Sequence, residues 1–122
     1  MKILIVDDEE MAIRMIELEL KRNNYEVLTS TDGREAIEKI KSEQPDLVIS
    51  DIMMPFMSGL ELLELIKSDS KKTPVILISA LDEFEVVQTA VDMGADDFII
   101  KPINMEELSI RIKRVLDKNN IS

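Results

Sequence analysis

Charged and hydroxyl side chains stand where four short apolar runs end, at widely separated points of the chain. They are Asp7 and Asp8 after the run 3–6, Asp51 just beyond the run 47–49, Ser79 after the run 75–78, and Lys101 after the run 98–100. An ionised carboxylate beside apolar surface loses hydration worth on the order of several kcal/mol unless a cation or a hydrogen-bond donor replaces the water. We therefore expect these residues to offset one another's charge in a single site.

Three carboxylates in one site repel one another unless a cation lies among them. Carboxylate oxygens are hard ligands that favour magnesium or calcium, and the sequence has no cysteine or histidine to hold a softer metal. An open, hydrated site suits Mg²⁺, which we expect to lie among Asp7, Asp8 and Asp51. The lack of histidine also excludes the usual catalytic triads.

A site of this composition can accept a phosphoryl group on a carboxylate. Asp51 would be the nucleophile, provided that a metal and a second cation offset the charge of the incoming group. Lys101 would pair with one phosphoryl oxygen, and Ser79 would donate a hydrogen bond to another. The residue types thus predict the formation of an aspartyl phosphate.

The apolar runs are expected to be the strands that position these residues. Runs at 3–6, 27–28, 47–49, 75–78 and 98–100 alternate with segments whose apolar residues recur at helical spacing, as in Leu108, Ile112 and Val115. Strict alternation of strand and helix predicts an α/β fold with helices on both faces of a parallel sheet. Because parallel strands end at one edge of the sheet, the polar residues are predicted to meet there.

Local patterns locate helix starts, one sheet edge and part of the core. Four capping residues are followed three positions later by glutamate: Asp32 and Glu35, Ser58 and Glu61, Asp82 and Glu85, Asn104 and Glu107. The run around Tyr25 and Val27 is short and polar, so we place it at an edge of the sheet. Met11, Met15 and Met93 have the spacing of core positions on helices.

The composition narrows the class of protein. A chain of 122 residues with 45% apolar content can fold as one domain without disulfides. A formal net charge of -10 and the lack of a basic patch argue against direct binding of nucleic acid. No apolar stretch approaches the roughly 20 residues of a membrane span. We therefore expect a cytoplasmic protein that binds neither nucleic acid nor membrane.

Taken in order, these motifs resemble those of response-regulator receiver domains of two-component signalling systems. The resemblance rests on LIVDDE with Asp7 and Asp8, DLVISDIMMPFMSG with Asp51, ILISA with Ser79, and GADDFIIKP with Lys101. It implies a flavodoxin-like fold, a three-layer sandwich built around a five-stranded parallel sheet of order 2-1-3-4-5. The receiver domain would occupy residues 1–118, with 119–122 as a frayed tail or the stub of a linker.

The resemblance also implies roles for individual residues. Asp51 would accept a phosphoryl group from a histidine kinase, and Mg²⁺ would be held by Asp8, Asp51 and the backbone carbonyl of Met53, with Asp7 acting through water. Ser79 and Phe98 would form the switch, although Phe98 lacks the hydroxyl of the tyrosine common at its position. The peptide bond between residues 101 and 102 would be cis, which is otherwise uncommon before proline.

The implied function is that of a signalling switch rather than a turnover enzyme. The domain would catalyse only its own phosphoryl transfer and slow autodephosphorylation. Its expected partners are a sensor histidine kinase or phosphotransfer protein and a downstream effector or fused output domain, which would read the fourth helix, fifth strand and fifth helix. A phosphorylation-dependent homodimer is a further expectation.

Three alternatives compete with this interpretation. Taken alone, Asp7 and Asp8 would be expected to cap the first helix. A magnesium-dependent phosphohydrolase of the haloacid-dehalogenase type also uses an aspartyl nucleophile, but in an Asp-x-Asp arrangement after the first strand, which the adjacent Asp7 and Asp8 do not match. A flavin-binding electron carrier would need a phosphate-cradling loop at the same place, where the acidic pair would repel phosphate.

Overall fold

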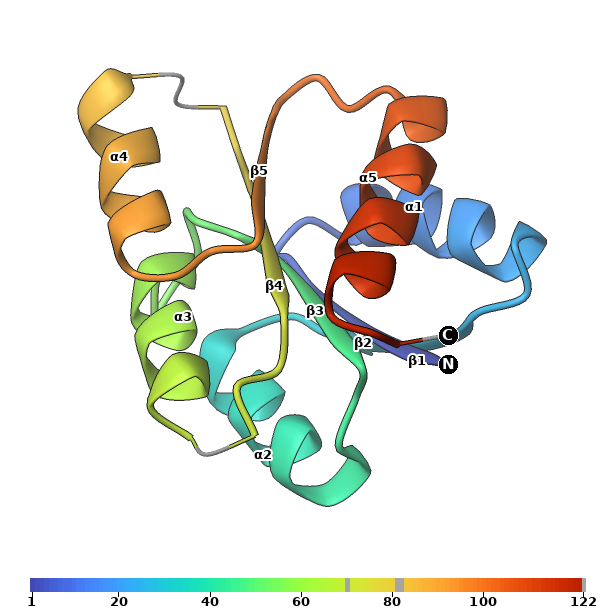
Figure 1. Cartoon of the computed structure of the whole chain (residues 1–122), viewed down its shortest axis with the longest axis horizontal. Helices are drawn as coiled ribbons and strands as arrows, with labels where there is room; N and C mark the ends of the chain where they lie inside the picture. The colour runs from blue at the N-terminus through green and yellow to red at the C-terminus, as the bar shows by residue number, and fades with distance from the viewer. Residues whose placement is uncertain (70, 81–82, 122) are drawn as a thin grey trace.

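The computed structural model describes residues 1–69, 71–80 and 83–121. Strands and helices alternate through these ranges (Figure 1). The strands are β1 Lys2–Val6, β2 Glu26–Ser30, β3 Leu47–Asp51, β4 Val75–Ser79 and β5 Asp97–Ile100. The helices are α1 Glu10–Arg22, α2 Gly33–Glu43, α3 Gly59–Ser68, α4 Phe84–Asp92 and α5 Met105–Lys118. Among the described residues no helix is both long and apolar enough to cross a membrane.

The strands form one parallel sheet in the order β2-β1-β3-β4-β5, which confirms the predicted fold. Strand β2 lies at an edge, as its polar sequence predicted, and its residues are less buried than those of β1, β3 and β4. The central strands are covered on both faces, which explains their continuous apolar sequences. Strand order therefore places β1, β3 and β4 side by side, and with them the residues that follow them.

Alternating side chains of each strand divide the core into two layers. Ile3 and Ile5 of β1 pack into a cluster with buried residues of α1 and α5, whereas Leu4 and Val6 pack into a second cluster with α2, α3 and α4. Figure 1 shows the same division, with α1 and α5 together on one face of the sheet. The two layers pack the sheet between helices on both faces. The strand ends at its carboxyl edge are therefore held in fixed positions.

Three of the four predicted helix caps are confirmed. The side chains of Asp32, Ser58 and Asn104 accept hydrogen bonds from backbone N–H groups three residues later, at 2.9, 3.2 and 3.0 Å. Asp82 lies outside the described residues. Helix α4 follows Glu83, whose side chain makes no capping hydrogen bond there.

The prediction that Met11 and Met15 belong to the core is wrong. Their exposed fractions are 70% and 52%, whereas Met93 packs against the core as predicted. Helix α1 carries two apolar stripes, and the one that contains Ile13 and Ile16 faces the sheet. At 3.6 residues per turn, Met11 and Met15 lie on nearly the opposite side. Helical spacing alone does not distinguish the two stripes.

Gly59 fixes the path of the chain between β3 and α3. Its N–H donates to the carbonyl of Ile52 at 2.9 Å. A Cβ at this position would lie 2.3 Å from the carbonyl oxygen of Asp51 and 2.9 Å from the Cα of Ile52. The start of α3 therefore packs directly on the backbone that carries Asp51.

We expect Gly59→Ala to lower the free energy of unfolding by about 1–3 kcal/mol, because the added methyl group meets backbone that cannot move without displacing Asp51. Gly33→Ala is the matched control at another helix start. There the added Cβ meets the Met57 side chain, at 2.7 Å from its Cβ, and a side chain shifts more readily than backbone. Urea unfolding measures both changes, and an equal or smaller loss for Gly59→Ala would contradict this packing.

Candidate functional site

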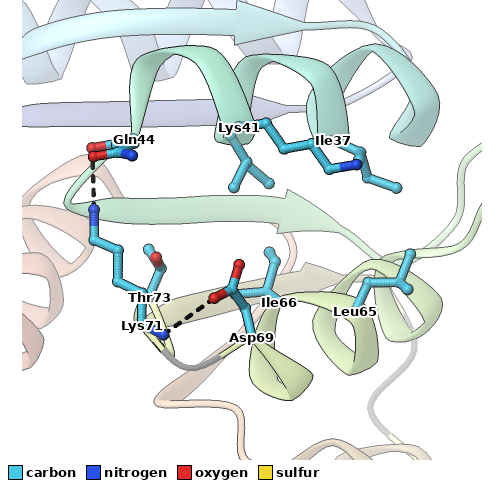
Figure 2. Close-up of a pocket in the computed structure, with 9 residues that line it drawn as sticks. Ile37, Lys41, Gln44, Leu65, Ile66, Asp69, Lys71 and Thr73 are labelled. Atoms are coloured by element: carbon cyan, nitrogen blue, oxygen red, sulfur yellow. Dashed lines mark hydrogen bonds between the residues drawn. The ribbon is translucent and has the colours of Figure 1, made fainter.

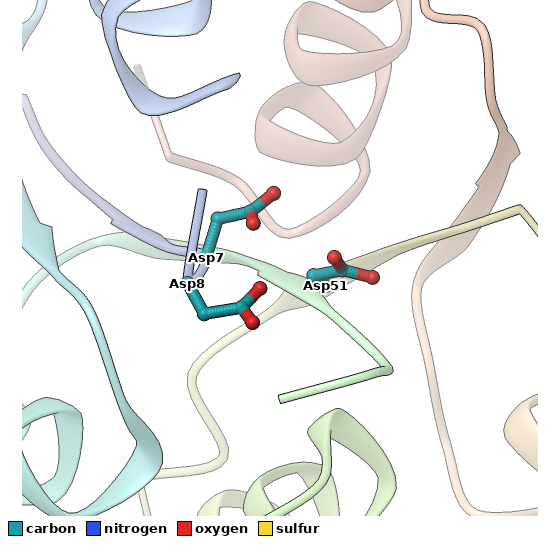
Figure 3. A group of neighbouring side chains, drawn as sticks. All are labelled: Asp7, Asp8 and Asp51. Carbon is teal, nitrogen blue, oxygen red and sulfur yellow. The ribbon is translucent and has the colours of Figure 1, made fainter. Parts of the chain in front are cut away.

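Three carboxylates distant in the sequence meet at the carboxyl edge of the sheet (Figure 3). Asp7 and Asp8 follow β1 and Asp51 ends β3, and each offers an oxygen within 4.8 Å of the others. Their convergence follows from the pairing of β1 with β3, in which Val6 lies opposite Ser50. Asp7 and Asp51 are buried and Asp8 is exposed, so the cluster opens to solvent on one side.

Lys101 supplies positive charge to the cluster. Its Nζ donates a hydrogen bond to Oδ2 of Asp51 at 3.1 Å and lies 3.8 Å from Oδ2 of Asp7. Its backbone N–H donates to the carbonyl of Ser79 at 2.8 Å, and the peptide bond to Pro102 is cis, as predicted. The end of β5 thus directs the ammonium group at the carboxylate that ends β3.

Asp51 is held from both sides of its carboxylate. Oδ1 accepts a hydrogen bond from the backbone N–H of Met53 at 3.3 Å, while Oδ2 accepts from Lys101. The next residue, Ile52, donates its N–H to the carbonyl of Ile78 on β4 at 3.0 Å. These bonds fix the orientation of the carboxylate. The predicted metal contact of the Met53 carbonyl stays a prediction.

Ser79 and Phe98 lie on the strands beyond β3. Ser79 is fully buried as the last residue of β4, the strand that pairs with β3. Phe98 on β5 lies opposite Leu77 and is half-buried against the core cluster of α2, α3 and α4. Ser79 therefore ends the strand next to Asp51, whereas Phe98 packs against the core. The role of both residues in switching stays a prediction.

Burial and like charges make the cluster electrostatically unfavourable in the absence of a cation. Burial is the main cause that raises the pKa of Asp7 from 3.8 to about 6, and the charges of Asp51 and Asp8 act in the same direction. The Glu9 N–H and the Lys101 ammonium offset part of this effect. For Lys101, burial acts to lower the pKa, but the hydrogen bond and charge of Asp51, with Asp7 and Glu9, raise it.

The donor set fits a hard divalent cation. Three carboxylates of the described residues converge here, two of them on buried residues, and oxygen ligands of this kind suit Mg²⁺ or Ca²⁺. The capping alternative for Asp7 fails, because its Oδ1 accepts from the N–H of Glu9 at 2.9 Å, ahead of the first residue of α1. A cation among the carboxylates would offset both the burial, which is the main cause of the raised pKa of Asp7, and the repulsion, which adds to it.

Glu9 is a member of the site that the sequence reasoning missed. Its Oε1 lies 3.7 Å from Nζ of Lys101, although its side chain is largely exposed. The acidic run that begins at Asp7 was the available signal, since it continues to the start of α1. Glu9 therefore competes with Asp51 and Asp7 for the same ammonium group.

Comparison with known proteins assigns the family. The model of the response regulator receiver domain matches residues 3–113. The chain belongs to the response-regulator receiver domain family. As a receiver domain it is a signalling switch of two-component systems, and the phosphohydrolase alternative receives no support.

Two relatives of the receiver domain are a transcriptional regulatory protein and a response regulator. It is 35% identical over 99% of its length to the alkaline phosphatase synthesis transcriptional regulatory protein PhoP of Bacillus subtilis. It is 42% identical over 94% of its length to the response regulator ArlR of Staphylococcus aureus. It covers 50% of the former and 52% of the latter, so the chain spans about half the length of these curated relatives.

A solved structure shares the fold over nearly its whole length. The chemotaxis response regulator CheY4 of Vibrio cholerae superposes with a TM-score of 0.88 at 36% identity. The alignment covers 94% of this chain and 98% of that chain. The fold described above is therefore shared with a known chemotaxis response regulator.

We expect Asp7→Asn to stabilise the metal-free receiver domain at pH 7. Because the pKa of Asp7 is raised from 3.8 to about 6, the folded state binds a proton more tightly than the unfolded chain, and stability falls as the pH rises through that interval. Asparagine removes this loss, which is worth up to about 3 kcal/mol at neutral pH.

Urea unfolding with EDTA between pH 4 and pH 8 measures the change. Glu38→Gln, at an exposed position of α2, is the control for loss of a single charge. Parallel pH profiles for the Asp7→Asn variant and the unmodified protein would show that Asp7 is not under electrostatic strain.

Proposed function

We propose that this receiver domain is a phosphorylation-activated switch in which Asp51 accepts a phosphoryl group in a Mg²⁺-dependent reaction. The observation that carries the proposal is the placement of Lys101 on Asp51 within a cluster of three carboxylates. The incoming phosphoryl group is negatively charged, so a carboxylate surrounded by like charges can accept it only if cations neutralise that charge. Lys101 and the hard-cation donor set meet that need.

The chain's own residues would act as follows. An oxygen of Asp51 attacks the phosphorus of the donor, and the bond between phosphorus and the donor's leaving atom breaks. Asp8, Asp51 and the carbonyl of Met53 would hold Mg²⁺, with Asp7 acting through water. The bound ion would neutralise charge on the phosphoryl oxygens. Lys101, already hydrogen-bonded to Asp51, would pair with one of these oxygens.

Phosphorylation would then bias a two-state element formed by Ser79, Lys101 and Phe98. The phosphoryl group brings up to two negative charges and new acceptors, which draw the Ser79 hydroxyl and the Lys101 ammonium inward. The backbones of Ser79 and Lys101 are already hydrogen-bonded, so their movements are linked. A nearly complete switch requires about 5.5 kcal/mol, which a few charge-assisted hydrogen bonds can supply. Slow autodephosphorylation would return the domain to its inactive state.

An apolar surface beside the site supports docking of a phosphodonor protein. The exposed residues Met11 and Met15 border a groove of about 550 Å³ that also includes Lys101, Ile103 and Met105. A protein seated there would lie next to the ammonium that pairs with Asp51. We propose a sensor histidine kinase or phosphotransfer protein as the partner, since apolar patches of this kind mark interaction sites.

The output would lie outside the described residues. The curated relatives are about twice as long as this chain, and one of them is named a transcriptional regulatory protein. We propose that a fused output domain or a separate effector, rather than this acidic chain, makes any contact with DNA. Phosphorylation-dependent homodimerisation and cytoplasmic localisation complete the proposal.

The phosphoacceptor role predicts a specific covalent change. With Mg²⁺ and acetyl phosphate as a small phosphodonor, intact-mass spectrometry should show the addition of one phosphoryl group. Asp51→Asn should abolish this addition, whereas Asp46→Asn, which changes another carboxylate outside the cluster, should not. Equal labelling of the Asp51→Asn variant would remove Asp51 from its proposed role.

The switch predicts that modification and response are separable. Ser79→Ala should still be phosphorylated, but its backbone amide shifts in β5 and α4 should stay near those of the unphosphorylated domain. Ser68→Ala, at the exposed end of α3, is the control and should respond fully. NMR spectra before and after phosphorylation test this, and a full response from the Ser79→Ala variant would exclude the proposed path through that hydroxyl.

A further inference from the structure

A second groove lies between α2 and α3, at the opposite edge of the sheet from Asp51. It has a volume of about 630 Å³, within the range of small-molecule sites. Gln44 and Thr73, which line it, precede β3 and β4, whereas Asp51 and Ser79 end those two strands. The groove is therefore separate from the phosphoryl-accepting site.

The groove has apolar walls interrupted by Lys41 and Asp69, and a group of polar residues at one end. Ile37 and Ile40 of α2 face Leu65 and Ile66 of α3 across it. Figure 2 shows Gln44, Lys71 and Thr73 gathered at one end, with Ile37 and Leu65 toward the other. Such a distribution matches an elongated molecule with one polar head and an aliphatic chain.

The polar end presents donors suited to an anion. Nζ of Lys71 donates to the backbone carbonyl of Gln44 at 3.4 Å, a long bond that leaves its other protons available. Thr73 is only 6% exposed, and its hydroxyl makes no hydrogen bond to any residue that the structure describes. No side-chain oxygen of the described residues is both fully buried and unpartnered, so the Thr73 hydroxyl is accessible from the groove and can donate to an acceptor brought by a ligand.

The charge of the groove also favours an anion, in a chain whose net charge is -10. Lys41 and Lys71 line it, against the single carboxylate of Asp69. Oδ1 of Asp69 already accepts a hydrogen bond from the backbone N–H of Lys71 at 3.2 Å. Positive charge is therefore concentrated locally beside an apolar wall, although the whole chain is acidic.

We propose that this groove binds a short aliphatic carboxylate. The alkyl chain would lie between Ile37, Ile40 and Leu65, and the carboxylate would accept hydrogen bonds from the Lys71 ammonium and the Thr73 hydroxyl. Burial of the chain gives affinity in proportion to its length, and the two donors select a charged head. This inference does not depend on phosphorylation of Asp51.

Octanoate is the probe, titrated into the full chain and followed by backbone amide NMR. We expect saturable shifts confined to residues that line the groove, including Ile40, Leu65 and Thr73. 1-Octanol, which has the same chain without the charge, should bind about tenfold more weakly. Asp51→Asn should bind octanoate unchanged, so failure here and failure of the phosphoryl-accepting role give different results.

Two variants test the polar end. Thr73→Val keeps the side-chain shape and removes only the hydroxyl, and we expect it to weaken octanoate binding about tenfold while leaving octanol binding unchanged. Lys71→Met should act similarly, whereas Lys72→Met, a neighbouring lysine outside the groove lining, should have little effect.

The proposal is overturned if octanoate produces no saturable shifts, or if its shifts fall instead on the exposed methionines of α1. It is equally overturned if octanol binds as tightly as octanoate, or if Lys72→Met weakens binding as much as Lys71→Met. Amide spectra of each variant without ligand establish that the fold is retained.

Discussion

Repulsion among the carboxylates at the end of β1 and β3 is the constraint on which the site depends. Asp7 and Asp51 are buried side by side, and one lysine, Lys101, is placed to neutralise them. One ammonium does not neutralise three aspartates, so the metal-free site keeps excess negative charge. Burial is the main cause of the raised pKa of Asp7, and the charges of Asp51 and Asp8 raise it further. In the proposed function, a cation would offset this charge and allow Asp51 to accept a phosphoryl group.

The fold tolerates this repulsion because contacts elsewhere in the molecule hold the backbone in place. Two hydrophobic layers hold the sheet between helices, and short contacts at Gly59 and between Lys101 and Ser79 lock the loops at its carboxyl edge. Side chains that repel one another therefore stay together because their strands are bound elsewhere. Stability in the core is what allows local electrostatic strain at the site.

Much of this could be predicted from the sequence, since each inference followed a local physical rule. Strand and helix alternation predicted the parallel sheet, and the polar sequence of β2 predicted its place at the edge. The convergence of Asp7, Asp8 and Asp51 followed from the shared direction of parallel strands. These rules concern which residues are apolar and where strands end, so they need no knowledge of side-chain packing.

Features that depend on three-dimensional packing were not predicted. Two apolar stripes on α1 satisfy helical spacing equally well, so sequence alone did not show that Met11 and Met15 face outward. The contact of Glu9 with Lys101 depends on a rotamer beyond the strand end. The groove between α2 and α3 arises from the separation of two helices, which no short motif encodes.

The central claim, that a strained acidic cluster is completed by a divalent cation, is tested most directly by the melting temperature of the domain during a Mg²⁺ titration. The account predicts a saturable rise that is absent in an Asp8→Asn variant, because a ligand that binds the folded state stabilises it. If Mg²⁺ gave no rise, or if sodium chloride at matched ionic strength gave the same one, the carboxylates would not form a metal site.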